Sequence, residues 1–340
     1  MSHPSTRTVV VTQRFFDAES LSFLAAHGCR VRIADLPAGQ ADADLSEEAL
    51  LGLLADADGW IVGHARVSRS LLTRLPRLQV IARRGVGFER VDTVAVQALG
   101  KVATIASGGN DACVADHALA LMLAVSHRLR ESQQQMNAGS WAILTGSDLY
   151  RKTVGIVGLG RIGRGVVQRL KGFEARVLAV TPNPDAAWAK ANGVACVDLD
   201  TALAHSDVLS LHAPLTPATR MLIDARALAR MKPSAILVNT ARGGLVDDAA
   251  LLDAIKAGRL AGAGLDVFLS ESDPAHEPVT RELIGLPNVV ATPHAGASTR
   301  EGLNRTNRIA AQCVVAVLDG GEPPEACVIA DGRLRRVAAI

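Results

Sequence analysis

Residues 152–182, KTVGIVGLGRIGRGVVQRLKGFEARVLAVTP, constrain the fold more than any other part of the chain. The apolar run at 154–157 predicts a buried parallel strand, and a second run at 176–180 predicts another. Between them stands the pattern G-x-G-x-x-G, followed by apolar residues at helical spacing. The pattern alone is weak evidence, but between a strand and a helix it predicts a dinucleotide-binding turn.

Each glycine of this turn has a predicted role. Gly158 permits the tight turn, Gly160 lets the backbone approach a pyrophosphate, and Gly163 lets the helix pack closely on the strand. The first N–H groups of the helix and its positive dipole end attract phosphates. The alternative is a glycine-rich turn without a ligand, which the strand–helix context disfavours.

Composition excludes several classes of protein. A length of 340 residues suggests two domains, and 49% hydrophobic residues can form a large core. A net charge of +2 and 3% aromatic residues give no basic footprint or stacking platform for nucleic acid. The five cysteines are scattered without a C-x-x-C pair, so neither a disulfide framework nor a zinc site is indicated. We expect no metal.

The N-terminal residues lack the apolar region of a signal peptide, and no apolar run approaches the roughly 20 residues that a membrane span needs. We therefore expect a soluble, cytoplasmic protein that binds neither membranes nor nucleic acid.

Strands and helices alternate along the chain, which indicates α/β lobes with doubly wound parallel sheets. The first lobe needs about five strands, predicted at 8–12, 31–34, 60–62, 80–82 and 102–105. Residues 111–137 are predicted to form one extended helix. Strands after residue 182 are predicted at 195–197, 208–211, 235–239, 261–267 and 288–291. The helix predicted at 299–318 has no following strand nearby, so we expect it to return to the first lobe.

A loop of two arginines and two glycines, residues 83–87, follows one strand of the first lobe. Ligands bind at the carboxyl ends of strands in such sheets, and glycines leave N–H groups accessible to a carboxylate. A tight turn with two solvated arginines explains the loop equally well.

Three charged groups follow strands of the second lobe. Arg242 follows ILVNTA, Glu271 follows LDVFLS and His294 follows VVATP. If the sheet is parallel, the three side chains face one crevice near the dinucleotide. Each alone could be a solvated side chain, but together they favour a functional site.

This set suits hydride transfer to a ketone, which builds negative charge on oxygen. Histidine titrates in the range needed to donate a proton there. A neighbouring carboxylate stabilises the protonated imidazole and fixes its tautomer. Arginine can hold a substrate carboxylate through two hydrogen bonds.

The chain resembles the D-isomer-specific 2-hydroxyacid dehydrogenases of the phosphoglycerate dehydrogenase and hydroxypyruvate reductase type. The matching segments occur in the order of the family: RRGVGFERVD (83–92), GGNDACVADHALALML (108–123), VGIVGLGRIG (154–163), HAPLTPATR (212–220), VNTARGGLVDDAAL (238–251), GAGLDVF (262–268) and TPHAGAST (292–299).

The resemblance implies two Rossmann-like lobes. A discontinuous, flavodoxin-like substrate lobe would comprise 1–106 and 300–340, and a cofactor-binding lobe 107–299. It also implies a homodimer built through the cofactor lobe. The implied activity is hydride transfer between NAD(P)H and a 2-keto acid or D-2-hydroxy acid such as phosphoglycerate, hydroxypyruvate or glyoxylate.

The resemblance assigns roles to individual residues. Arg242 would bind substrate and polarise its carbonyl, His294 would be the acid/base, and Glu271 would pair with it. Ser272 replaces a proline that often follows this glutamate, and Glu277 lies in the same loop as a rival. Substrate contacts would come from Arg66, Arg84, Gly85, Val86, Gly87 and Arg242. Cofactor contacts would come from Gly158, Leu159, Gly160, Arg161, Ile162, Gly163, Thr181, His212, Ala213, Pro214, Thr219, Thr240, Ala241, Asp266, His294 and Gly296.

The chain departs from the family after the second strand of the fingerprint. The acid that binds the ribose hydroxyls is replaced by Thr181, and no arginine stands beside it for a 2′-phosphate. NAD is therefore the expected cofactor, with NADP possible and only a modest preference between them. Two other functions stay open: a non-catalytic NAD(H) sensor of the corepressor type, and a dehydrogenase of a small anion that is not a 2-hydroxy acid, such as phosphite or formate.

Overall fold

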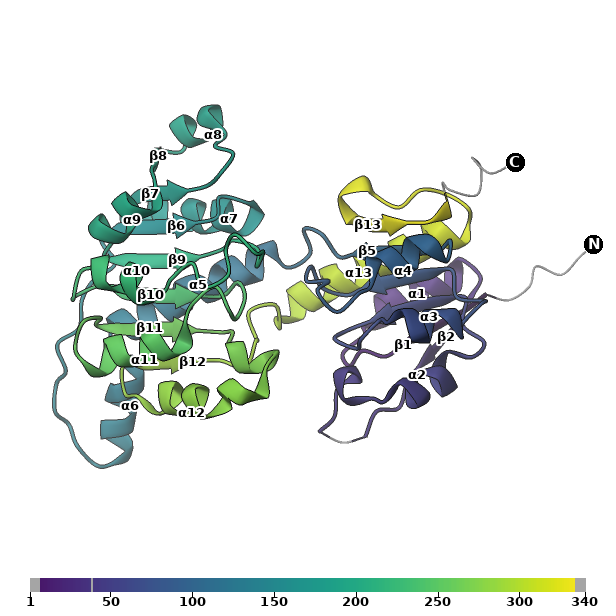
Figure 1. The fold of residues 1–340 in the computed structure, drawn as a ribbon, viewed down its shortest axis with the longest axis horizontal. Coiled ribbons are helices and arrows are strands. Elements are labelled where there is room, and N and C mark those ends of the chain that lie inside the picture. Colours follow the sequence, from purple (N-terminus) through teal and green to yellow (C-terminus); the bar gives the residue numbers. More distant parts are fainter. Residues whose placement is uncertain (1–6, 38, 334–340) are drawn as a thin grey trace, which may run out of the picture. The chain divides into compact units, whose positions relative to one another are not determined.

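The computed structural model describes residues 7–37 and 39–333. The chain divides into two compact units. Unit 1 comprises Met1–Asn110 and Thr299–Ile340, and unit 2 comprises Asp111–Ser298. Each unit is an α/β fold built around one β-sheet (Figure 1).

Unit 1 contains a six-stranded sheet in the order β13-β5-β4-β3-β1-β2. Its strands are β1 (Arg7–Val11), β2 (Cys29–Ile33), β3 (Gly59–Val62), β4 (Val80–Arg83), β5 (Val102–Ile105) and β13 (Val328–Asp331). The order 2-1-3-4-5 of the parallel strands is flavodoxin-like. Strand β13 was not predicted. It pairs antiparallel with β5 and shifts register between Val328 and Ala330, so its sequence lacks a regular alternation.

Helices cover both faces of this sheet, as expected for a parallel sheet. One core contains residues of α2 (Glu47–Leu54), α3 (Arg69–Thr73) and α4 (Thr93–Ala98). The other contains residues of α1 (Ala18–Ala26) and α13 (Arg300–Leu318). The late helix α13 therefore belongs to the same unit as the start of the chain.

Unit 2 contains a seven-stranded parallel sheet in the order β12-β11-β10-β9-β6-β7-β8. Its strands are β6 (Thr153–Val157), β7 (Arg176–Val180), β8 (Val194–Cys196), β9 (Val208–Leu211), β10 (Ile236–Asn239), β11 (Gly262–Leu265) and β12 (Val289–Ala291). The direction of strand order reverses between β6 and β9, which is the ligand-binding switch point of such sheets. The predicted α/β class with two doubly wound parallel sheets is confirmed.

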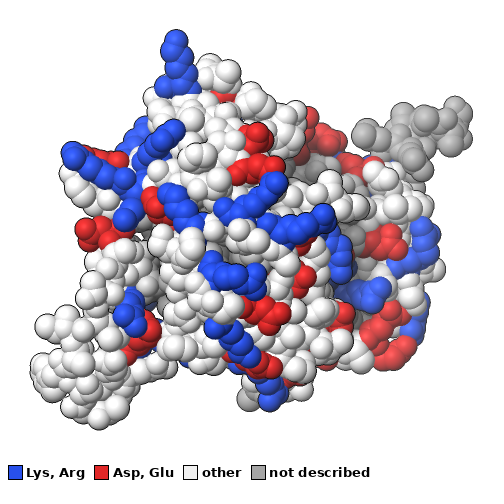
Figure 2. Space-filling model, turned by 60° about the vertical axis from the view of Figure 1, so that its left-hand side comes forward, with Lys and Arg blue, Asp and Glu red and all other residues white. Residues whose placement is uncertain are grey.

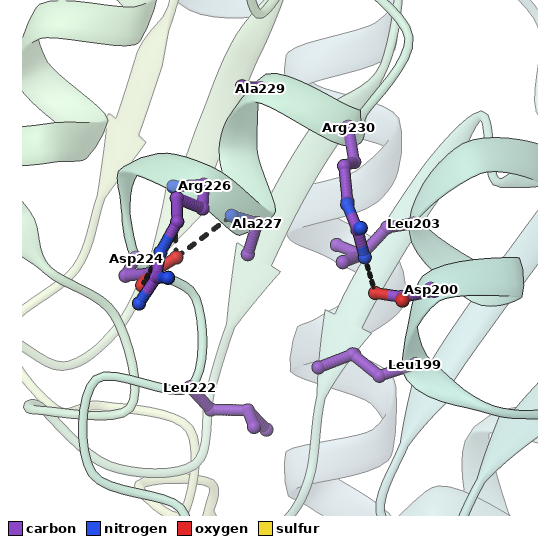
Figure 3. A pocket seen from close by; sticks show the side chains of 9 residues that line it. All are labelled: Leu199, Asp200, Leu203, Leu222, Asp224, Arg226, Ala227, Ala229 and Arg230. Carbon is purple, nitrogen blue, oxygen red and sulfur yellow. Dashed lines mark hydrogen bonds and ion pairs between the residues drawn. The ribbon is translucent and has the colours of Figure 1, made fainter.

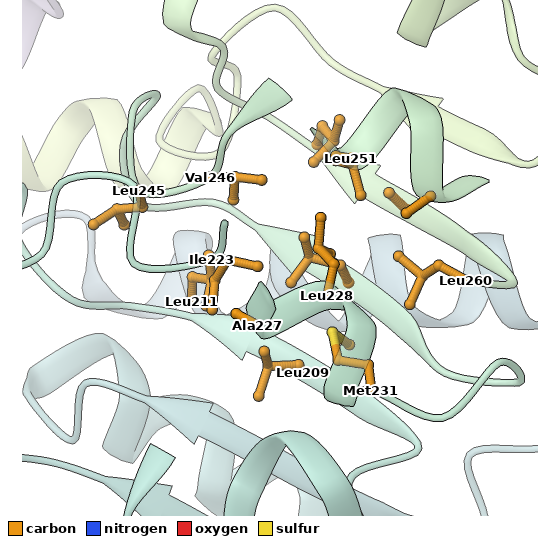
Figure 4. Packing of buried hydrophobic residues seen from close by; sticks show 14 of the residues in the cluster. Leu209, Leu211, Ile223, Ala227, Leu228, Met231, Leu245, Val246, Leu251 and Leu260 are labelled. Atoms are coloured by element: carbon orange, nitrogen blue, oxygen red, sulfur yellow. The ribbon is translucent and has the colours of Figure 1, made fainter. Parts of the chain in front are cut away.

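Two hydrophobic cores sandwich the sheet of unit 2. One face packs against α5 (Asp111–Ser126), α7 (Arg161–Leu170) and α8 (Ala186–Ala191). The other packs against α9 (Leu199–His205), α10 (Ala225–Arg230), α11 (Asp248–Lys256) and α12 (Glu277–Gly285). Figure 4 shows part of the second core, which includes Leu228, Leu251, Ile223 and Val246.

The prediction of one extended helix over 111–137 is wrong. The chain breaks into α5 and α6 (Leu129–Asn137), which are bent by 59°. Arg128 adopts a left-handed φ of 54°, and its guanidinium binds the carboxylate of Glu131 in the first turn of α6. The apolar stripe also ends there, because α5 buries nine residues and α6 buries none.

Within 7–37 and 39–333, no single helix is long and apolar enough to span a membrane; only α5 and α6 taken together reach that length and composition. On the face shown in Figure 2, basic and acidic side chains are interspersed. Exposed ion pairs of the described residues include Arg74 with Glu48 and Arg32 with Asp56.

Candidate active site

The fingerprint turn shows why its glycines stand where they do. Gly158 has a φ of 100°, and a Cβ on it would lie 2.6 Å from the amide nitrogen of Ala213. A Cβ on Gly163 would lie 2.1 Å from the carbonyl oxygen of Gly158. A Cβ on Gly160 would meet nothing within 4 Å. The outer two glycines are therefore required by packing, whereas the middle one borders open space.

Buried polar atoms around this turn fit a dinucleotide. Helix α7 begins at Arg161, and its N-cap Gly160 offers no side-chain cap, so the first N–H groups of the helix are available to phosphate oxygens. Among the described residues, the buried Nδ1 of His212 and Oγ1 of Thr240 have no hydrogen-bond partner. They follow β9 and β10 at the same sheet edge. Unsatisfied buried polar atoms are costly, so atoms of this kind are suited to ligand contacts.

His212 stays neutral at ordinary pH. Burial lowers the pKa of its imidazole to about 4, and its Nε2 lies 2.9 Å from the hydroxyl of Ser210. Its carbonyl lies against Gly158, so the residue joins the β9 end to the fingerprint turn. A neutral ring suits it to hydrogen bonding with a cofactor rather than to proton transfer.

The end of β7 contains a cluster that the sequence reasoning missed. Thr181 follows the strand directly and is half-buried. Four residues later, the carboxylate of Asp185 accepts a hydrogen bond of 3.1 Å from the guanidinium of Arg164. That guanidinium also lies 4.7 Å from the centre of the Trp188 ring. The spacing of Arg164 from Asp185 in the sequence gave no signal of this contact.

Glu271 and His294 form a direct pair. The Nδ1 of His294 lies 2.6 Å from Oε2 of Glu271, and the other carboxylate oxygen accepts the N–H of Phe268 at 2.8 Å. Both side chains are 40% exposed. The rival Glu277 instead binds Arg281. The carboxylate that contacts Nδ1 of His294 is thus that of Glu271.

The backbone of His294 is held in an uncommon conformation. Its φ is 51°, in the left-handed region that non-glycine residues seldom adopt. Its N–H donates to the carbonyl oxygens of Asp266 at 2.8 Å and of Thr292 at 3.1 Å. Such conformations persist only where the surroundings fix them, and they cluster at functional sites.

Arg242 lies in the loop after β10, whose backbone is braced by Asn239. The Asn239 side chain donates to the carbonyl oxygen of Arg242 at 2.9 Å and accepts the N–H of Ala241 at 3.0 Å. The next residue is Gly243. A Cβ there would lie 2.1 Å from the carbonyl oxygen of Phe268, so the close approach of the two backbones requires glycine. The sequence analysis did not single out Asn239, although its position at the strand end is typical of bracing side chains.

Strand register brings the three predicted groups to one edge of the sheet. Asn239 of β10 pairs with Leu265 of β11, which pairs with Ala291 of β12. Arg242 lies three residues after the end of β10, and His294 lies three residues after the end of β12. Glu271 lies six residues after the end of β11.

The other predicted cofactor residues of unit 2 divide into two groups. The hydroxyl of Thr219 holds its own turn, accepting from the N–H of Thr216 at 2.8 Å and donating to the carbonyl oxygen of Pro214 at 2.7 Å. Asp266 is 1% exposed, and its carboxylate accepts the N–H groups of Ala295 and Gly296. These two side chains therefore shape the site. The remaining positions lie in loops (Leu159, Ala213 and Ala241) or in the first turn of α7 (Arg161 and Ile162).

The predicted substrate residues Arg66 and Arg84 and the loop 85–87 lie in unit 1, after β3 and β4. Arg84 donates to the carbonyl oxygen of Arg14 at 3.2 Å, and burial lowers the pKa of its guanidinium. Gly85, Val86 and Gly87 are half-buried, and Arg66 is exposed. The loop is thus packed rather than a freely solvated turn.

A separate hollow of about 550 Å³ lies between α9 and α10 (Figure 3). Its arginines are paired within it, Arg230 with Asp200 and Arg226 with Asp224. None of the predicted site residues lines it. Among the described residues, no group of three or more His, Cys, Asp or Glu side chains could hold a metal ion.

Comparison with known proteins identifies the family. Residues 119–296 match the NAD-binding domain of the D-isomer specific 2-hydroxyacid dehydrogenases. The chain is 42% identical over 289 residues to a D-3-phosphoglycerate dehydrogenase of Mycobacterium tuberculosis, covering 84% of this chain and 54% of that protein. It is 36% identical over 265 residues to a hydroxypyruvate reductase of Thermotoga maritima, covering 77% and 85%.

A solved structure of similar fold is a D-lactate dehydrogenase of Aquifex aeolicus complexed with NAD and lactic acid. Its TM-score is 0.80 at 26% identity, with 95% of this chain and 99% of that one covered. The chain spans about half the length of the phosphoglycerate dehydrogenases that it matches. With its fingerprint turn, its Glu271–His294 pair and these similarities, the chain belongs to the D-isomer-specific 2-hydroxyacid dehydrogenase family.

Proposed function

We propose that this chain interconverts a 2-keto acid and a D-2-hydroxy acid with a nicotinamide dinucleotide as redox partner. The observation that carries the proposal is the 2.6 Å contact between His294 and Glu271 at the sheet edge that also bears Arg242. Glyoxylate, hydroxypyruvate and phosphohydroxypyruvate are the proposed substrates, since relatives carry the names phosphoglycerate dehydrogenase, hydroxypyruvate reductase and glyoxylate reductase.

The residues divide the work of the reaction. The fingerprint turn and α7 would hold the pyrophosphate, and the buried, unpartnered polar atoms of His212 and Thr240 would contact the rest of the cofactor. When bound, the nicotinamide supplies or accepts the hydride. Arg242 would bind the substrate carboxylate and polarise the carbonyl.

His294 would move the proton. In the direction of reduction, Nε2 donates to the carbonyl oxygen as negative charge develops there. Glu271 accepts the Nδ1 proton in a hydrogen bond and stabilises the imidazolium form that precedes donation. In unit 1, the N–H groups of loop 85–87 are proposed to bind a carboxylate.

The test is oxidation of paired enantiomers. Purified protein is given NAD or NADP with the D and L forms of glycerate, lactate and 3-phosphoglycerate (the last available as the D form). Turnover restricted to D enantiomers supports the proposal. Phosphite and formate are assayed in the same way. Turnover of one of these two alone would replace the proposal with the small-anion alternative, and NADH binding without turnover would favour the sensor.

We propose NAD as the cofactor, with NADP accepted. Thr181 presents neither an acid that would repel a 2′-phosphate nor an arginine that would attract it. The wild type is expected to show only a modest ratio of kcat/KM for NADH over NADPH. Thr181→Asp is expected to raise that ratio at least tenfold, as measured by initial rates. Thr181→Ser is the matched control, and a strong wild-type preference for either cofactor would contradict the proposal.

We also propose a cytoplasmic homodimer whose interface includes α6 and the segment after it. Five large apolar side chains there are exposed, among them Trp141 at 83% and Ile143 at 95%. In Figure 1, α6 and this segment stand away from the sheet of unit 2. The remaining three are Leu129, Met136 and Tyr150. We call α6 and the segment after it, up to Tyr150, the apolar arm. Exposed apolar side chains gathered in one such segment are suited to pack against a second copy of the chain.

Sedimentation equilibrium tests the arm. The wild type should be dimeric, and the double variant Trp141→Ser, Ile143→Ser should shift toward monomer. Ile33→Ser, an exposed apolar residue of unit 1, is the control and should leave the mass unchanged. A monomeric wild type would refute the interface.

A further inference from the structure

A chain of polar side chains runs from α5 to the loop that carries His294. The Nε2 of His117 lies 2.9 Å from the hydroxyl oxygen of Thr292. That hydroxyl donates to Oδ1 of Asp266 at 2.5 Å. The His117 side chain is 21% exposed, and that of Asp266 is 2% exposed. All these residues belong to unit 2.

The number of protons on each side chain decides which group donates and which accepts in this series of hydrogen bonds. Burial raises the pKa of Asp266, but hydrogen bonds from His117, Thr292 and the backbone of 295–296 outweigh burial and lower it overall. The carboxylate is therefore ionised and can only accept hydrogen bonds. Thr292 has a single proton, which it gives to Asp266. The contact between His117 and Thr292 therefore requires a proton on Nε2 of His117.

The Asp266 carboxylate, which ends this series of hydrogen bonds, fixes the backbone around His294. Oδ1 accepts the N–H of Ala295 at 2.7 Å, and Oδ2 accepts that of Gly296 at 2.9 Å. The main-chain oxygen of Asp266 accepts the N–H of His294 at 2.8 Å. Asp266 thus accepts hydrogen bonds from the backbone of His294 and of the two residues after it. These bonds hold His294 in its left-handed φ.

The His117 ring is also built into this loop by packing. A Cβ on Gly296 would lie 3.4 Å from Cδ2 of His117 and 3.0 Å from Oδ2 of Asp266. The glycine therefore gives the imidazole and the carboxylate room to approach the same turn. A side chain that only filled space would not need a proton on Nε2.

We propose that His117 is a positioning residue: through its Nε2–H it orders Thr292 and Asp266, and so holds His294 in the geometry for proton transfer. The inference rests on the proposed acid–base role of His294. It assigns a function to a histidine on α5, 177 residues earlier in the sequence than His294. Loss of the donor should loosen the turn at 292–296 and affect kcat more than substrate binding.

The test compares two substitutions of similar shape. His117→Gln keeps an N–H donor near the position of Nε2, whereas His117→Met has similar length and no donor. His117→Met is expected to lower kcat by about tenfold to a hundredfold, because small displacements of a catalytic group have effects of this size. His117→Gln should stay within about threefold of wild type on the same reasoning. Neither should change the Kd for NADH by more than about twofold, because the fingerprint turn is untouched.

A second readout needs neither substrate nor turnover. The Nδ1 proton shared with Glu271 across 2.6 Å should give a downfield proton NMR signal in the protein without cofactor. His117→Met should broaden or shift this signal, and His117→Gln should preserve it. Assignment comes from its loss in Glu271→Gln. Melting temperature is recorded for each variant to separate loosening of the turn from global unfolding.

The outcomes separate this inference from the proposed function. Equal kcat values and an unchanged signal in both His117 variants, with an active wild type, would overturn the positioning role alone. An inactive wild type would overturn the proposed function, and the NMR comparison would still decide whether His117 orders the His294–Glu271 pair. Equal losses in Met and Gln variants would show that the ring's shape matters rather than its donor.

Discussion

Replacing His294 by asparagine is expected to lower kcat by about a hundredfold to ten-thousandfold, the range that general acid–base catalysis contributes. Asparagine can keep a hydrogen bond to Glu271 but cannot transfer a proton at the Nε2 position. The Kd for NADH, measured by fluorescence titration, should stay within about twofold of wild type, since the phosphates are proposed to bind at the α7 N-terminus.

His276→Asn is the matched control. It lies in the segment that precedes α12, contacts Asp273 at 3.6 Å and has no part in the Glu271–His294 pair. Its turnover should equal that of the wild type. Turnover near the wild-type value in His294→Asn would remove this histidine from the mechanism.

Replacing Arg242 by glutamine should lower kcat/KM by about a hundredfold or more, because hydrogen bonds from a charged group contribute about 1.5–3 kcal/mol each. Both kcat and KM should change, since the guanidinium would bind the carboxylate and also polarise the carbonyl. Steady-state kinetics with the best 2-keto acid measure both. Added guanidinium ion should restore part of the activity.

The control for Arg242 is Arg226→Gln, since Arg226 is an arginine on the same unit with 95% exposure. It should leave kcat/KM unchanged. If Arg242→Gln lost no more activity than Arg226→Gln, the carboxylate would have to be held by other groups. A loss of NADH binding in Arg242→Gln would instead assign the arginine to the cofactor.

Much of the fold followed from local patterns. The apolar runs that became β6, β9 and β10 are continuous because both faces of a parallel sheet are covered. The packing reasons for Gly158 and Gly163 also follow from the motif. Strand β13 escaped prediction because four residues with a register shift have no clear period. The break at Arg128 escaped it because a left-handed residue other than glycine leaves no compositional mark.

The site was harder to predict in full, for a physical reason. Strand ends pointed to Arg242, Glu271 and His294, because parallel strands bring their carboxyl ends to one edge. The choice between Glu271 and Glu277 depended on a short 3-10 turn that aims only the first at His294. The contacts of His117 with Thr292 and of Arg164 with Asp185 join distant parts of the chain. Such contacts follow from tertiary packing and have no periodic signal in a single sequence.

The most direct measurement is the decay of reduced-cofactor absorbance with purified protein. NADH and NADPH are each tested against glyoxylate, hydroxypyruvate, pyruvate, larger 2-keto acids and phosphohydroxypyruvate. We expect rapid oxidation of the cofactor with at least one of these acids, abolished by His294→Asn and unaffected by His276→Asn. Tight cofactor binding without turnover across the whole panel would contradict the account.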